Sequence, residues 1–186
     1  MHESVDRILA AIAVLSDEAR TELFERLASE AGFSSPHQSS STLPTTPCEI
    51  QGSADVTIVF DGGSQGNPGP GYGSYALTRA GDGSQVLVRL DFGRTMTNNE
   101  AEYETLIAAL QGLSERVEAA GESTSDLCIE ARGDSALVIH QVEGTWQTKD
   151  NRMRLLRDRV QSLLHRFKAH RLVLQGREES VRVLGH

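Results

Sequence analysis

The sequence predicts an α/β domain with a five-stranded mixed sheet, preceded by a small helical hairpin. Two observations lead to this fold class. Strand-like segments rich in β-branched and aromatic residues follow one another from residue 56 to residue 93, with glycine-rich turns between them. Longer segments with apolar residues at helical spacing then alternate with two more short strands. The order of three strands, a helix, a strand, two helices and a strand is typical of a layered α/β domain.

Residues 1–33 predict two short helices. Val5, Ile8 and Ile12 recur at helical spacing, and Ser16 is suited to cap a second apolar helix. Such a hairpin is too small to bury a core alone, so we expect it to dock on another surface. A second copy of the chain, giving a homodimer, and a different protein partner are both candidates. A hairpin without a binding role is the alternative.

Residues 34–53 predict a flexible linker, because the stretch is rich in Ser, Thr and Pro. The α/β domain then occupies residues 54–186, and a hydrophobic content of 38% is adequate for its core. No apolar run approaches the ~20 residues of a membrane span. Glu3 and Asp6 lie where a secretory signal would be positive, so we expect a cytoplasmic protein that does not bind membranes.

The first strand of the domain is predicted at residues 56–60, and Gly62 and Gly63 follow almost at once. We therefore expect Asp61 where the strand gives way to a loop, with its carboxylate exposed at the sheet edge. The glycines and prolines up to Pro70 place no bulky side chain beside it, which leaves room for a ligand or another backbone. The alternative is a simple hairpin in which the aspartate only caps a turn.

Two further strands, at residues 71–79 and 85–93, are predicted to complete an antiparallel meander. Thr97 should then start a long helix, because its hydroxyl lies three residues before Glu100 in a capping-box pattern. Glu102 falls near the start of this helix, at the border of its apolar stripe. Position alone would make Glu102 an ordinary solvated or paired carboxylate.

The fourth strand is predicted at residues 127–132. Gly133 then places Asp134 at its carboxyl end, the edge at which open α/β sheets bind their ligands. The last predicted elements are two helices and a strand, at residues 134–143, 151–167 and 171–174.

Three separated motifs resemble type 1 ribonuclease H in its short bacterial and archaeal form. They read DGGSQGNPGP from Asp61, TNNEAEY from Thr97 and GDSALV from Gly133. The resemblance covers the chain from about Val56 to about Leu174, and it is specific because three motifs must coincide in order. It implies a ribonuclease H-like fold, with a five-stranded mixed sheet whose first three strands are antiparallel.

The resemblance also implies a catalytic site. Asp61, Glu102 and Asp134 match three of the four metal-binding carboxylates of the family. The family's reaction is endonucleolytic hydrolysis of the RNA strand of an RNA/DNA hybrid. Oxygen-only ligands select hard cations, so we expect Mg²⁺ or Mn²⁺, with two ions bound together with substrate. Without cations, three converging carboxylates would repel one another and raise their own pKa values.

Recognition of the hybrid must rest on the 2′-hydroxyl, the group that marks a strand as RNA. Thr97 could meet a DNA phosphate at the helix N-terminus, although a plain N-cap is an equally good interpretation. The candidate nucleic-acid contacts are Gly62, Gly63, Asn67, Thr97, Asn98 and Asn99.

The charge of the chain is unevenly distributed. The net charge of −8 argues against a nucleic-acid partner, but residues 149–186 contain ten Lys or Arg and only four acids, which makes this segment +6 and the preceding residues −14. The arginine-rich helix predicted at residues 151–167 would then supply the positive surface, since the long basic insertion of some family members is absent. A solvated helix face is the alternative.

The sequence departs from the family near its last residues. Counted from Arg177, the family pattern RxxNxxAD would place an Asn at position 180 and the fourth carboxylate at position 184, where this chain has Ser180 and Leu184. We therefore expect the final helix to be at best a stub. Two functions follow: a metal-dependent ribonuclease H weakened by the missing carboxylate, or a non-catalytic module on the same fold that binds hybrids or another protein.

Overall fold

The computed structural model describes residues 52–185, so the predictions for residues 1–51, including the hairpin, its dimer or protein partner and most of the linker, lie outside this range. None of the described helices is long and apolar enough to cross a membrane. The elements are β1 (Val56–Ser64), β2 (Gly69–Arg79), β3 (Gln85–Met96), α3 (Asn98–Ala119), a 3₁₀ turn (Thr124–Asp126), β4 (Cys128–Gly133), α4 (Ala136–Val142), α5 (Asn151–Leu164), β5 (Ala169–Leu174) and α6 (Arg177–Leu184).

The five strands form one mixed sheet in the order β3-β2-β1-β4-β5. Strands β1, β2 and β3 pair antiparallel, whereas β4 pairs parallel with β1 and with β5. The mixed sheet predicted from the sequence is confirmed. The pairing of β1 with β4 ends at Val59 and Arg132, so β1 runs on past the carboxyl end of β4.

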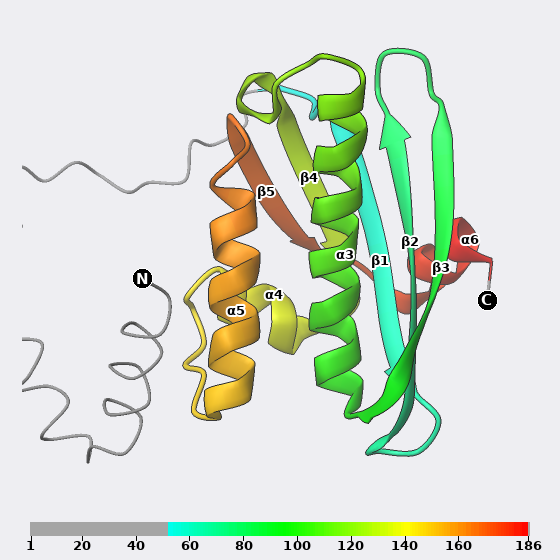
Figure 1. Ribbon diagram of the computed structural model, residues 1–186, viewed down its shortest axis with the longest axis vertical. Coiled ribbons are helices and arrows are strands. Elements are labelled where there is room, and N and C mark those ends of the chain that lie inside the picture. The colour runs from blue at the N-terminus through cyan, green and yellow to red at the C-terminus, as the bar shows by residue number, and fades with distance from the viewer. Residues whose placement is uncertain (1–51, 186) are drawn as a thin grey trace, which may run out of the picture. The chain divides into compact units, whose positions relative to one another are not determined.

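Helices cover both faces of the sheet, as Figure 1 shows, with α3, α4 and α5 on one face and α6 on the other. Successive residues of β1 divide between these faces because side chains alternate along a strand. Ile58 and Phe60 belong to the larger core beneath α3, α4 and α5. Val59 packs with Ala76 and Leu184 in a smaller cluster beneath α6.

The long helix α3 begins at the predicted capping box. The Thr97 backbone N–H donates to Glu100 Oε2 over 2.7 Å, and the Glu100 N–H donates to Thr97 Oγ1 over 3.2 Å. These two bonds satisfy backbone donors that the first turn of a helix otherwise leaves unpaired. They fix where α3 starts and therefore place Glu102 in its second turn.

Strand β1 is longer than predicted. It continues to Ser64, so Asp61 lies inside the strand, opposite Ser74 of β2, and only 9% of it is exposed. The prediction of an exposed carboxylate at a strand-to-loop boundary was therefore wrong. The glycines that suggested a loop serve a different purpose, because a Cβ on Gly62 would lie 2.5 Å from the carbonyl carbon and oxygen of Ala101 in α3. Glycine here lets two backbones touch.

The prediction of a stub at the end of the described chain was also wrong. Helix α6 has eight residues and ends on Gly185 in a left-handed conformation (φ 77°), the usual glycine stop for a helix. Leu184 is fully buried against Val59 and Ala76. The helix forms because this apolar contact of Leu184 holds it to the sheet.

Replacing Gly62 by alanine should separate β1 from α3. The added methyl group would overlap backbone atoms that cannot rotate away, so we expect Gly62→Ala to lower the free energy of unfolding by about 1–3 kcal/mol. Gly81→Ala is the matched control, because a Cβ there meets nothing within 4 Å. Urea denaturation of both variants measures the effect, and equal stabilities would contradict the contact.

Candidate active site

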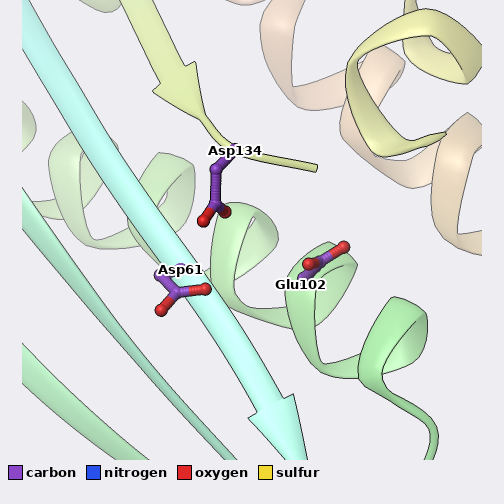
Figure 2. A group of neighbouring side chains, drawn as sticks. All are labelled: Asp61, Glu102 and Asp134. Carbon is purple, nitrogen blue, oxygen red and sulfur yellow. The ribbon is translucent and has the colours of Figure 1, made fainter. Parts of the chain in front are cut away.

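Three acidic side chains from distant parts of the sequence converge at one place. Asp61 lies on β1, Glu102 on α3, and Asp134 directly after β4, as Figure 2 shows. Each can offer a carboxylate oxygen such that all three oxygens lie within 4.8 Å of one another. We call these residues the carboxylate site.

The sheet and α3 position these residues by simple geometry. Asp61 is two residues beyond the last β1–β4 pair, at Val59, so no β4 backbone lies beside it. The chain leaves β4 at Gly133, which puts Asp134 at the same end of the sheet. Glu102 joins them because Gly62 allows the backbone of α3 to approach β1 at Ala101.

The electrostatics of Glu102 show that the carboxylate site is short of positive charge. The pKa of Glu102 is raised from 4.5 to about 7, and burial is the largest cause. The charges of Asp134 and Asp61 also raise this pKa, whereas a hydrogen bond from Ser135 and the charge of Arg177 lower it. Its Oε2 is buried and has no hydrogen-bond partner among the described residues. A buried oxygen of this kind is costly unless something pairs with it.

Two polar residues near the carboxylate site were missed at the level of sequence. Arg177 at the start of α6 places Nη1 3.5 Å from Asp134 Oδ2, with 73% of its side chain exposed. Ser135 caps α4 by accepting from the Val138 N–H, and it also hydrogen-bonds Glu102. Both residues carry a signal in the sequence, since Ser135 precedes an apolar helix and Arg177 is the first residue of the family pattern RxxNxxAD.

The residues present fit a divalent cation. All three donors are carboxylate oxygens, the ligands preferred by hard ions such as Mg²⁺ and Mn²⁺. The unpaired Oε2 of Glu102 and the mutual repulsion of the three acids are both relieved when positive charge enters between them.

The loop between β1 and β2 is tied to the start of α3 by the predicted asparagines. Asn98 Oδ1 accepts from the Ser64 backbone N–H over 2.9 Å and from Ser64 Oγ over 2.7 Å. The Asn98 backbone N–H donates to Asn67 Oδ1 over 3.2 Å. The two asparagines therefore lie together beside the glycine-rich end of β1, within one connected hydrogen-bond network.

The other predicted nucleic-acid contacts lie close by but differ in how accessible their polar groups and backbone are to a ligand. The Thr97 hydroxyl is engaged in the capping box, whereas Asn99 is exposed in the first turn of α3. Gly62 is buried against α3, and Gly63 lies beneath the side chain of Tyr72. Gly62 is thus closed to a ligand on the side that faces the helix.

The basic segment is less positive in the structure than its composition suggests. Arg152 contacts Glu100 at 3.3 Å, and Arg157 contacts Asp158 at 2.7 Å. Arg166, just after α5, pairs with Glu118 of α3 at 2.6 Å. Arg152 and Arg166 therefore serve partly to join α5 and the residues that follow it to α3.

Comparison with known proteins places the chain in a family. A family model described as reverse transcriptase-like matches residues 59–183. RNase H1 from the halophilic archaeon Halobacterium salinarum has a crystal structure that is 39% identical, with a TM-score of 0.58, and the match covers 69% of this chain and 90% of that one. The chain belongs to the type 1 ribonuclease H family. LC11-RNase H1, solved in complex with an RNA/DNA hybrid, is 26% identical with a TM-score of 0.58, over 69% of this chain and 90% of that one.

Curated sequences agree with this family. Ribonuclease HI of Halobacterium salinarum is 45% identical over 112 residues, which is 60% of this chain and 52% of that protein. The bifunctional protein Rv2228c of Mycobacterium tuberculosis is 40% identical over 116 residues, 61% of this chain and 29% of that protein. This type 1 ribonuclease H homologue therefore spans about half the length of the first relative and less of the second.

The raised pKa of Glu102 predicts a pH-dependent stability in the absence of metal. The folded protein holds this proton up to about pH 7, whereas the unfolded chain releases it near pH 4.5, so stability should fall as the pH rises through that window. We expect wild type in EDTA to lose up to about 3 kcal/mol between pH 4.5 and pH 8 relative to Glu102→Gln, which cannot ionise. Urea denaturation at both pH values tests this, and parallel pH profiles would contradict it.

Proposed function

We propose that this protein is a divalent-metal-dependent endonuclease that hydrolyses the RNA strand of RNA/DNA hybrids. The observation that carries the proposal is the carboxylate site itself, in which three acids from three elements converge and one buried oxygen lacks a partner. Folded proteins do not keep such a cluster for stability, because its charges oppose folding. The family, and the hybrid bound to LC11-RNase H1, supply the substrate class.

Each residue of the site has a distinct role in this proposal. Asp61, Glu102 and Asp134 would together hold two Mg²⁺ or Mn²⁺ ions, with Asp61 as the ligand that the two ions share and Glu102 and Asp134 as ligands of one ion each. When bound, two such ions supply an activated water and neutralise the leaving oxygen of the RNA strand. The protein holds its three acids in place beforehand, through the β1–α3 contact at Gly62 and the end of β4.

The nucleic-acid contacts are assigned to the surface beside this site. Asn67, Asn98 and Asn99, with the backbone at Gly62 and Gly63, would meet the minor groove near the scissile phosphate, where 2′-hydroxyls are displayed. Thr97 would lie near a phosphate of the DNA strand at the N-terminus of α3. Arg177, beside Asp134, would contribute positive charge toward the phosphate.

A second candidate function rests on one observation. Position 184, which the family pattern gives to a fourth carboxylate, is a fully buried leucine. A hybrid-binding module without catalysis, or a protein-interaction module, would tolerate this loss. The three retained acids favour the enzyme, because a binder has no need of charges that repel one another and the substrate phosphates.

Removing any one carboxylate should nearly abolish cleavage. We expect Asp61→Asn, Glu102→Gln and Asp134→Asn each to lower the rate of hybrid cleavage in Mg²⁺ or Mn²⁺ by at least about a hundredfold, because no other described acid lies within the cluster. Glu104→Gln is the matched control on the same helix, since Glu104 pairs with Arg94 outside the site. Labelled RNA/DNA hybrid, with and without EDTA, provides the assay.

The outcomes of that assay separate the two functions. Cleavage that is lost with EDTA and with the three variants, but kept in Glu104→Gln, supports the enzyme. Hybrid binding without cleavage by the wild type in either metal would establish the binding module instead. Absence of both binding and cleavage would remove both nucleic-acid functions.

Position 184 offers a separate test, because Leu184 is close to the carboxylate site. It packs on Val59 and Ala76, and this pair lies next to the pair of Asp61 and Ser74 on the same face of the sheet. An aspartate here would lose apolar contacts and add a fourth negative charge beside Asp61.

We therefore expect Leu184→Asp to lower the melting temperature in EDTA and to recover part of the loss in millimolar Mn²⁺. Leu184→Asn is the matched control, since it has the same shape without the charge, and it should gain no more from Mn²⁺ than the wild type. Thermal unfolding with and without Mn²⁺ measures the difference, and an equal Mn²⁺ response of the two variants would show that position 184 does not reach the ion.

A further inference from the structure

Tyr72 is an aromatic side chain with an unusual setting on the face of the sheet that carries Asp61. It lies on β2 within the stretch Gly69–Gly73, and 44% of it is exposed. The space beside the neighbouring glycines is already occupied by other side chains. A Cβ on Gly73 would meet Thr105 of α3, and one on Gly71 would meet Met96. Tyr72 is therefore the aromatic side chain that this glycine-rich strand presents outward.

The phenol end of Tyr72 lies over Gly63 of β1. A Cβ on Gly63 would be 2.7 Å from Tyr72 Oη and 2.9 Å from Cζ, and the two residues are paired across the strands. Asp61 is two residues back along β1, so it points to the same face at a distance of about 7 Å along the strand. The hydroxyl of Tyr72 is thus placed about one nucleotide step from the carboxylate site.

A structural role alone accounts for only part of this arrangement. An aromatic ring that covers a glycine on the next strand stabilises a sheet, and phenylalanine would do so equally well. The hydroxyl makes no hydrogen bond to any other residue in the described part of the chain. It can both donate and accept a hydrogen bond, as a ribose 2′-hydroxyl can.

We infer that the Tyr72 hydroxyl hydrogen-bonds the 2′-hydroxyl of the RNA nucleotide adjacent to the scissile phosphate and so positions that strand beside the carboxylate site. This inference rests on the proposed function, because it places the scissile phosphate at the carboxylate site. Gly63 contributes by having no side chain, which lets the Tyr72 phenol lie directly against the β1 backbone beside the carboxylate site. Tyr72 is a positioning residue in this scheme, and its contact would select RNA over DNA in the cleaved strand.

The test removes the hydroxyl from the protein and from the substrate in turn. Cleavage is measured as kcat/KM for the full-length wild type and for Tyr72→Phe. Three substrate strands are compared, each paired with DNA: an all-RNA strand, a strand with a single deoxynucleotide just before the main cleavage position, and a strand with a single deoxynucleotide just after it. Tyr72→Phe should lower kcat/KM on the all-RNA strand by roughly three- to tenfold, the range that one hydrogen bond contributes. For the wild type, one of the two deoxynucleotides should lower kcat/KM by a similar factor. For Tyr72→Phe, the same deoxynucleotide should lower kcat/KM no further.

Tyr75→Phe is the matched control on the same strand. Tyr75 is buried on the opposite face, where its hydroxyl approaches Gly112 of α3, so the same chemical change is made away from the substrate. Its preference for the all-RNA strand should equal that of the wild type. An unchanged melting temperature of Tyr72→Phe would exclude a loss that comes from unfolding.

The outcomes distinguish this inference from the proposed function. If the wild type cleaves hybrids but the losses from Tyr72→Phe and from the deoxynucleotides simply multiply, or if Tyr72→Phe cleaves like the wild type, the inference is overturned and the function stands. If the wild type binds hybrids without cutting them, dissociation constants measured in EDTA replace kcat/KM in the same comparison of variants and substrates. They then show whether Tyr72 contacts the 2′-hydroxyl. A wild type that neither cuts nor binds hybrids overturns both.

Discussion

The contact between the backbones of β1 and α3 at Gly62 is the constraint on which the site depends. A side chain at this position would collide with the carbonyl group of Ala101 and the amide nitrogen of Glu102. Because glycine is present, the second turn of α3 rests directly on the central strand, and Glu102 comes within reach of Asp61. The capping box at Thr97 fixes the start of the helix, and the Gly62 contact fixes how close it lies. Together, the capping box and the Gly62 contact determine where Glu102 lies.

The buried carboxylates of this fold show two different solutions to the same problem. Glu130 on β4 is almost completely buried, and although burial raises its pKa, hydrogen bonds from Arg171 and Arg132 bring it below the usual range. Glu102 has no such arginine pair, and its pKa rises to about 7. The contrast is informative, because the fold can neutralise a buried acid with its own cations and does so one strand away. Among the described residues no arginine pair of this kind holds Glu102, which is the arrangement expected where the cation comes from outside.

Local signals explain what the sequence could predict. The capping box of α3 lies within four consecutive residues, and Asp134 follows directly on a short strand ended by glycine, so both were predicted correctly. The convergence of the three acids was available only through the spaced motifs of the family. The spacing of Asp61 and Glu102 in the sequence does not by itself predict that their carboxylate oxygens lie close together.

The predictions that were wrong depended on contacts between distant segments. Gly62 was interpreted as part of a loop because the residue that makes glycine necessary there, Ala101, lies some forty residues away in the sequence. Helix α6 was expected to be a stub because its sequence departs from the family pattern, yet its stability comes from Leu184 packing on Val59 and Ala76. A position that lacks its catalytic residue can still contribute a side chain to the core.

The hydrogen bonds of Asn98 have a consequence for how a duplex would be read. Its Oδ1 accepts from both the backbone N–H and the hydroxyl of Ser64, which fixes the amide orientation and leaves only the NH₂ group directed outward. This exposed group can donate but cannot accept. In the minor groove every base pair offers acceptors, the N3 of purines and the O2 of pyrimidines, and ribose oxygens accept as well. A donor held in this way discriminates poorly among base sequences, so an enzyme that uses it would survey hybrids of any sequence and leave selectivity to the sugar.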